Sequence, residues 1–200
     1  TGAPSNVMQR GILAGPEGAL VAFITLFAVS LPLLVEREKK NGTWDRIFMI
    51  TGDEKAFRWG LTLAYTLLQI VIAVLAVGIL TFKFKLTLSV HTVVLLSLLA
   101  IYSFFLAAGF TYFSRWSRLA SHTGSLTFLA MIASLAAGCF WTFEIYPTSL
   151  RRLVLLLPPG ALMQMLHQAS LQQIYGAVGG AILLLLLGVL FLNLKHSELH

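Results

Sequence analysis

Charged residues are scarce in this sequence. Only 11% of its 200 residues are Asp, Glu, Lys or Arg, whereas 58% are hydrophobic and the mean hydropathy is +0.84. So few charges cannot cover the surface of a water-soluble domain of this size. The composition therefore indicates that lipid surrounds most of the chain.

Several chemical motifs are also missing. No GxxxxGK[ST] loop occurs, so this chain does not hold a nucleoside triphosphate by that means, and HExxH and GxSxG are absent too. The single cysteine, Cys139, excludes an internal disulfide, and the five histidines are too dispersed to predict a metal site. The net charge of +6 is spread over loops without interleaved aromatic residues, which argues against nucleic-acid binding. We therefore predict no catalytic, metal-binding or cofactor-binding residues in this chain.

Long uncharged runs are present instead. About 20 apolar residues in an α-helix cross the hydrocarbon layer, and a helix satisfies its own backbone hydrogen bonds there. We therefore predict an all-α polytopic membrane protein. Its five predicted transmembrane helices lie at about 18–35, 59–82, 90–113, 119–143 and 174–192.

Half of the charges fall in one segment. Of the 22 charged residues, 11 lie between Glu36 and Arg58. If this segment is cytoplasmic, nine basic residues lie inside and five outside, in agreement with the positive-inside rule. With an odd number of spans the N-terminus then lies outside, so we expect one further helix upstream.

The pattern within 36–58 is that of three helical segments separated by two breaks. The last of them, the start of the second span, can be capped by Thr51 or Asp53. Gly42 suits the C-terminal end of a helix, and Thr43 can cap the next one. The apolar face of this second helix, predicted over 43–51, would carry Trp44, Ile47 and Phe48. Asp45 and Arg46 would point away from it. Such an amphipathic helix suits a docking surface; the alternative is a solvated loop anchored in the lipid headgroups.

A second irregular segment, 144–173, is apolar but interrupted by prolines. Pro147, Pro158 and Pro159 divide it into pieces too short to cross a bilayer. We predict two short helices that enter from the outer face, with Glu144 at the mouth. The alternative is an ordinary outer loop that contacts lipid headgroups.

Two stretches resemble one family. "EREKKNGTWDRIFMITG" is similar to the cytoplasmic segment of the type 2 ABC exporter permeases, the membrane subunits of bacterial drug, lipid and polysaccharide exporters. "FEIYPTSLRRLVLLLPPGALMQMLHQ" is similar to that family's outer segment, with Pro147 and Pro158 on its prolines. The residues that match the cytoplasmic segment are Glu36, Arg37, Glu38, Gly42, Thr43, Asp45 and Arg46.

This resemblance implies a multi-pass permease of the bacterial plasma or inner membrane that lacks the family's first helix. It implies ABC ATPase subunits as partners, ATP on those partners, and a second permease copy or similar permease in a homo- or heterodimer. The segment 36–58 would be the hairpin that couples to the ATPase, through the matching residues together with Trp44, Ile47 and Phe48. The segment 144–173 would be the outer gate, with Glu144, Pro147, Pro158 and Pro159.

Two other functions stay open at this point. A membrane-embedded lipid-modifying enzyme would need polar groups that converge near the membrane face, and Glu144 is the only acid outside the charged segment and the two termini. An ATP-independent channel or assembly factor would work without nucleotide.

Overall fold

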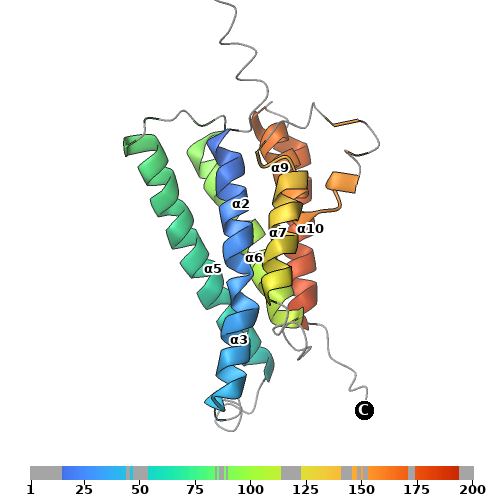
Figure 1. The fold of residues 1–200 in the computed structure, drawn as a ribbon. Helices are drawn as coiled ribbons and strands as arrows, with labels where there is room; N and C mark the ends of the chain where they lie inside the picture. Colours follow the sequence, from blue (N-terminus) through green and yellow to red (C-terminus); the bar gives the residue numbers. More distant parts are fainter. Residues whose placement is uncertain are drawn as a thin grey trace, which may run out of the picture.

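The computed structural model describes residues 15–43, 46, 54–83, 85, 88, 90–113, 123–140, 146–147, 150, 153–170 and 174–193. Over these ranges the chain is mostly helical and forms no β-strand. The helices, shown in Figure 1, are α2 (Pro16–Ala28), α3 (Ser30–Lys40), α5 (Glu54–Gly78) with its π-helical extension (Ile79–Lys83), α6 (Thr92–Phe113), α7 (Thr123–Ala136), α9 (Pro158–Ser170) and α10 (Ile174–Asn193).

Three helices are long and apolar enough to cross a membrane: Lys55–Lys83, Thr92–Phe113 and Tyr175–Asn193. They lie where the sequence predicts spans at 59–82, 90–113 and 174–192. The two other predicted spans correspond to shorter apolar helices, Pro16–Pro32 and Ser125–Ala136. The fold is therefore that of a helical membrane protein, and the five-span arrangement stays a prediction.

The first predicted span, 18–35, consists of two helices. Helices α2 and α3 lie end to end in one column, separated at Val29 (Figure 1). Pro32 explains the break, because it has no N–H to donate to the carbonyl of Ala28. Helix α3 then continues to Lys40, which carries the charged sequence 36–40 beyond the apolar part of the column.

The predicted helix 119–143 ends earlier than the sequence suggested. Helix α7 stops at Ala136, because Gly138 adopts a left-handed conformation with φ of +76°. The N–H of Cys139 donates to the carbonyl of Ser134 and the N–H of Gly138 to that of Leu135, both at 3.3 Å, which is the pattern of a Schellman cap. The 14 residues of α7 extend over only about 21 Å, less than the hydrocarbon thickness of about 30 Å.

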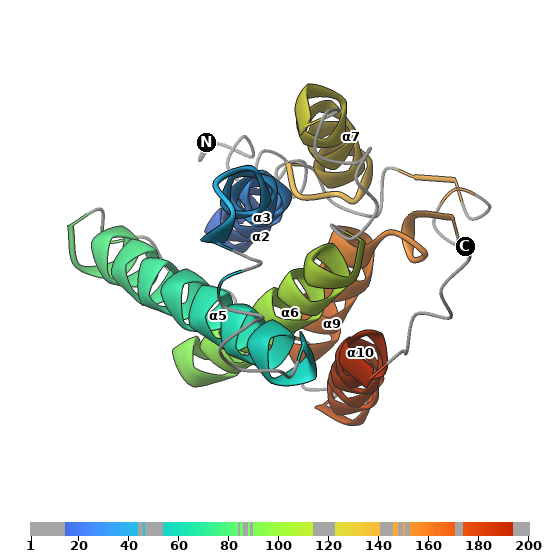
Figure 2. The ribbon, with the colours of Figure 1, turned by 90° about the horizontal axis from the view of Figure 1, so that it is seen from below.

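Helix α6 is the central element of the bundle. It packs against α2, α3, α5, α9 and α10, and Figure 2 shows it in the middle of the arrangement. A helix that is apolar all around suits such a position. Its side chains Leu95, Leu99 and Tyr102 are fully buried. They join a core that also contains Ile24 of α2 and Leu162 of α9.

The outer faces of the long helices remain apolar. On α5, Leu67 and Leu75 each expose more than half of their surface, and Leu183 and Leu186 do so on α10. Exposing such continuous apolar faces to water would be unfavourable, whereas lipid tails accommodate them. The exposed faces thus agree with a position in the membrane.

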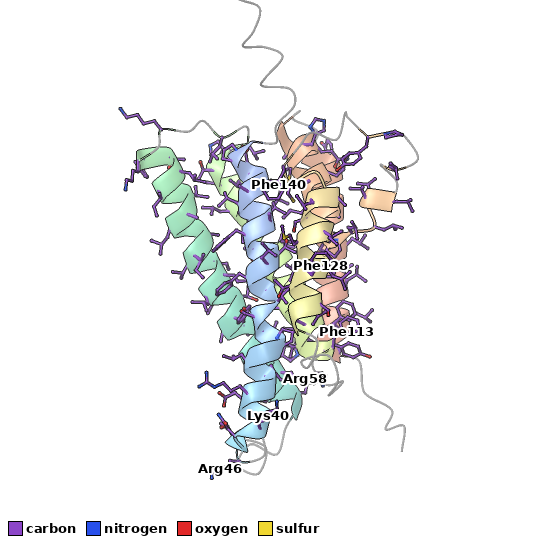
Figure 3. All side chains as sticks on the ribbon, viewed as in Figure 1. Lys40, Arg46, Arg58, Phe113, Phe128 and Phe140 are labelled. Atoms are coloured by element: carbon purple, nitrogen blue, oxygen red, sulfur yellow. The ribbon has the colours of Figure 1, made fainter. Side chains whose placement is uncertain are left out.

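The helix directions place several connections at one end of the bundle. Helix α3 ends and α5 begins at the bottom of Figure 1, where α6 and α10 also end and α7 begins. Lys40, Arg46 and Arg58 lie toward this end in Figure 3, and Phe140 lies near the opposite one. We call the end with Lys40, Arg46 and Arg58 the charged end, and the opposite one the far end.

Candidate functional site

The charged end presents basic side chains to the surroundings. Arg37 and Lys40 on α3, Arg46, and Lys55 at the start of α5 are all exposed. Arg58 differs, since its side chain is buried within the bundle. The segment 36–58 is thus bounded by two helices that are anchored in the apolar bundle, while its described charges, Arg58 excepted, face outward.

The predicted break at Gly42 is confirmed. Gly42 has φ of +68°, a left-handed conformation, directly after the end of α3. The N–H of Asn41 still donates to the carbonyl of Arg37 at 3.0 Å, and the N–H of Arg46 donates to the carbonyl of Gly42 at 3.2 Å. Thr43, directly after the glycine, and Arg46 are both helical, and the bond from Arg46 to Gly42 has the spacing of an α-helical bond.

The other predicted coupling residues are only partly placed. The backbones of Glu36, Arg37 and Glu38 belong to the last turns of α3. Trp44, Asp45, Ile47 and Phe48 lie outside the described residues, so their assignment to one helix face stays a prediction.

We expect Gly42→Ala to destabilise the protein by about 1 kcal/mol, because a side chain makes the left-handed conformation unfavourable. No atom lies within 4 Å of the position that the new Cβ would take, so the cost is conformational and not steric. Gly60→Ala is the matched control, since Gly60 lies inside α5 with equally open space. There alanine should be neutral or stabilising by about 0.5–1 kcal/mol. Thermal unfolding of both variants in detergent checks this, and equal midpoints would contradict it.

The joint between α2 and α3 is held by a tyrosine of α5. The hydroxyl of Tyr65 donates to the carbonyl of Phe27 at 2.7 Å, and the hydroxyl of Ser30 donates to the same carbonyl at 2.7 Å. The two hydroxyl oxygens also lie within hydrogen-bond distance of each other, so their two protons serve two of these three contacts at a time. The rings of Phe27 and Tyr65 stack with centroids 5.8 Å apart. A carbonyl near the helix break is thereby satisfied by a neighbouring helix.

A second hydroxyl contact holds α2 just before the joint. Thr25 of α2 and Tyr102 of α6 share a hydrogen bond of 2.8 Å between their hydroxyls, in a fully buried position. After the joint, Leu31 and Val35 of α3 pack in one apolar cluster with Tyr65 and Ala107. The column α2–α3 is therefore fastened to α5 and α6 on both sides of its break.

Tyr65, Tyr102 and Thr25 were not predicted from the sequence to be important residues. Each is a single polar residue in an apolar run, and tyrosine and threonine are common in membrane helices. Their partners are far away in the sequence, as with Thr25 and Tyr102. Pro32 is the nearby residue that could have indicated the joint from the sequence, because a proline interrupts the hydrogen bonds of a helix.

In the part of the outer segment that the structure describes, helix α9 lies at the far end, and Leu150, Leu153 and Val154 before it are helical as well. Helix α9 starts at Pro158, where a proline is favourable because the first N–H groups of a helix need no partner in the helix. Pro159 is buried, and Pro147 is exposed. Gly160 lies so close to the backbone of Val154 that a Cβ would be 2.1 Å from its carbonyl oxygen.

Helix α9 packs against α2, α6, α7 and α10, so it is part of the bundle. The structure brings Pro158 and Pro159 together in its first turn, while Glu144 lies outside the described residues. The gate function of these residues stays a prediction.

A known protein family matches the chain. The family model described as "ABC-2 family transporter protein" matches residues 5–194, which is nearly the whole chain. No curated protein matches the sequence. No solved structure matches it either.

Proposed function

The chain belongs to the ABC-2 family of transporter proteins, and we propose that this permease is the membrane subunit of an ATP-driven exporter. Its proposed partners are ABC ATPase subunits, which would bind and hydrolyse the ATP, and a second permease copy or similar permease. The proposed cargo belongs to the drug, lipid or polysaccharide class. The proposed location is the bacterial plasma or inner membrane.

One observation supports the proposed coupling role of the charged end. Helix α3 leaves the apolar bundle, ends at a left-handed glycine and is followed at once by a new helical turn. A helix that starts just outside the bundle on an abrupt break offers a compact surface to a soluble partner. A plain connection between two membrane helices would need no such break, since a few residues are enough to reverse direction.

The joint suggests how a push at the charged end would reach the membrane. Movement of the ATPase subunits would displace the helix after Gly42 and, with it, α3. Because α2 and α3 are separate helices, α3 would change its angle at Val29 together with the parts of α5 and α6 that pack against it, while α2 stays in the core. ATP binding would then bias an equilibrium between two arrangements of the bundle.

A labelling experiment tests this proposal, because an ATPase can act only on a cytoplasmic surface. With Cys139 first replaced by serine, Lys40→Cys should react with a membrane-impermeant maleimide only after the cells are permeabilised. Lys83→Cys, at the end of the α5 extension, should react in intact cells. Both lysine side chains are exposed, so the two positions are matched in accessibility. The reverse labelling would place the charged end outside and would overturn the coupling role.

A further inference from the structure

The interface between α5 and α6 contains polar side chains deep inside the bundle. The hydroxyl of Thr62 donates to that of Thr111 across the interface at 3.2 Å. One turn further along α5, Tyr65 belongs to the same cluster as Ala107 of α6. The next turn of each helix brings Gln69 and Ser103, because the two helices run in opposite directions. The packing therefore places Gln69 and Ser103 at the same level of this interface.

Both side chains are buried without a hydrogen-bond partner. Gln69 and Ser103 are each only 1% exposed. Neither Nε2 nor Oε1 of Gln69 has a partner, and neither does Oγ of Ser103. A buried polar group without a partner is costly, and in a membrane-spanning helix no bulk water can compensate for it.

The hydroxyl of Ser103 also departs from the behaviour of other hydroxyls in these helices. Several of them donate to the carbonyl four residues before, namely those of Thr25, Thr66, Thr81, Ser97, Thr111 and Ser134. Ser103 could donate in the same way to the carbonyl of Leu99, but its hydroxyl does not form this bond. The orientation of this hydroxyl thus calls for a partner outside its own helix.

We propose that Gln69 and Ser103 form a binding site for one buried water molecule between α5 and α6. The site offers three polar atoms, and a buried water typically makes about three hydrogen bonds. The water would donate to Oε1 of Gln69, accept from its Nε2, and pair with the hydroxyl of Ser103. A direct bond between the two side chains would leave one of the amide atoms unsatisfied, so water suits the site better than direct contact does.

A crystal structure of the full chain in a lipidic phase, at a resolution that shows ordered waters, tests the proposal. We expect one density peak within hydrogen-bond distance of Gln69 and Ser103, and its loss in Gln69→Met. Methionine has nearly the length of glutamine but offers no amide group. Absence of the peak in the unchanged protein, or a direct contact between Gln69 and Ser103, would overturn the proposal.

Thermal unfolding provides an independent test through the coupling of the two positions. Ser103→Ala should lower the unfolding midpoint by about 2–4 °C in the unchanged protein, because the water loses a partner. In a Gln69→Met background the same change should lower it by much less, since the site is already lost. An equal shift in both backgrounds would contradict a shared water.

Ser134→Ala is the matched control for this comparison. Ser134 is buried to the same degree as Ser103, but its hydroxyl donates to the carbonyl of Ala130 at 2.8 Å. It lies on α7, away from the α5–α6 interface. We expect its replacement to give the same shift with either residue at position 69.

Discussion

Simultaneous replacement of Trp44 and Phe48 by alanine should weaken association with the ATPase subunit by about 2–4 kcal/mol. This corresponds to a roughly 30- to 800-fold increase in Kd. Aromatic side chains in desolvated pockets of an interface carry a large share of the binding energy. The helical turn that starts at Gly42 supports this role, since it would put the two residues on one face. Membrane insertion should be unaffected, because no membrane-spanning helix is changed.

Co-purification of the permease with its ATPase, quantified over a range of ATPase concentrations, measures this effect. The matched control removes two aromatic side chains elsewhere, by Phe128→Ala and Phe140→Ala. Both are exposed, and in Figure 3 Phe128 lies about midway along the bundle and Phe140 near the far end. Equal recovery of ATPase with both double variants would remove the coupling role from Trp44 and Phe48. It would favour the alternative that these residues only rest among lipid headgroups.

Gly160→Ala should destabilise the permease by about 1–3 kcal/mol, the usual range for forcing an extra group into a packed interior. The added Cβ would lie 2.1 Å from the carbonyl oxygen of Val154 and 3.0 Å from its carbonyl carbon. The obstacle is backbone, which cannot rotate away as a flexible side chain does. The first turn of α9 would therefore have to move away from the segment before it.

Gly179→Ala is the control for this prediction, because Gly179 lies within α10 and a Cβ there meets no atom within 4 Å. That variant should be neutral or slightly stabilised, since alanine favours a helix more than glycine does. Thermal unfolding in detergent compares the two. Similar midpoints would show that α9 can move away from Val154 at little cost, and that its fit at the far end is loose.

Several features of this permease follow from the sequence alone, because they depend on neighbouring residues. Uncharged runs of sufficient length are enough to predict the long helices α5, α6 and α10. A segment that crosses lipid must pair its backbone N–H and C=O groups within itself, and a helix does so. The break at Gly42 is equally local: a glycine after a charged helix end adopts the left-handed conformation that other residues avoid. The family resemblance also rests on short local stretches, and the family match agrees with it.

Other features depend on which segments meet, and the sequence does not contain that information in a readable form. The end of α7 at Ala136 was missed because glycine is also common within membrane helices, so Gly138 alone did not predict a cap. The bond from Tyr65 to Phe27 and the bond between Thr25 and Tyr102 join residues that are far apart in the chain. Gln69 and Ser103 become a site only because α5 and α6 pack with these residues at one level. In each case a polar residue in an apolar run has many possible partners, and tertiary packing alone decides which one it finds.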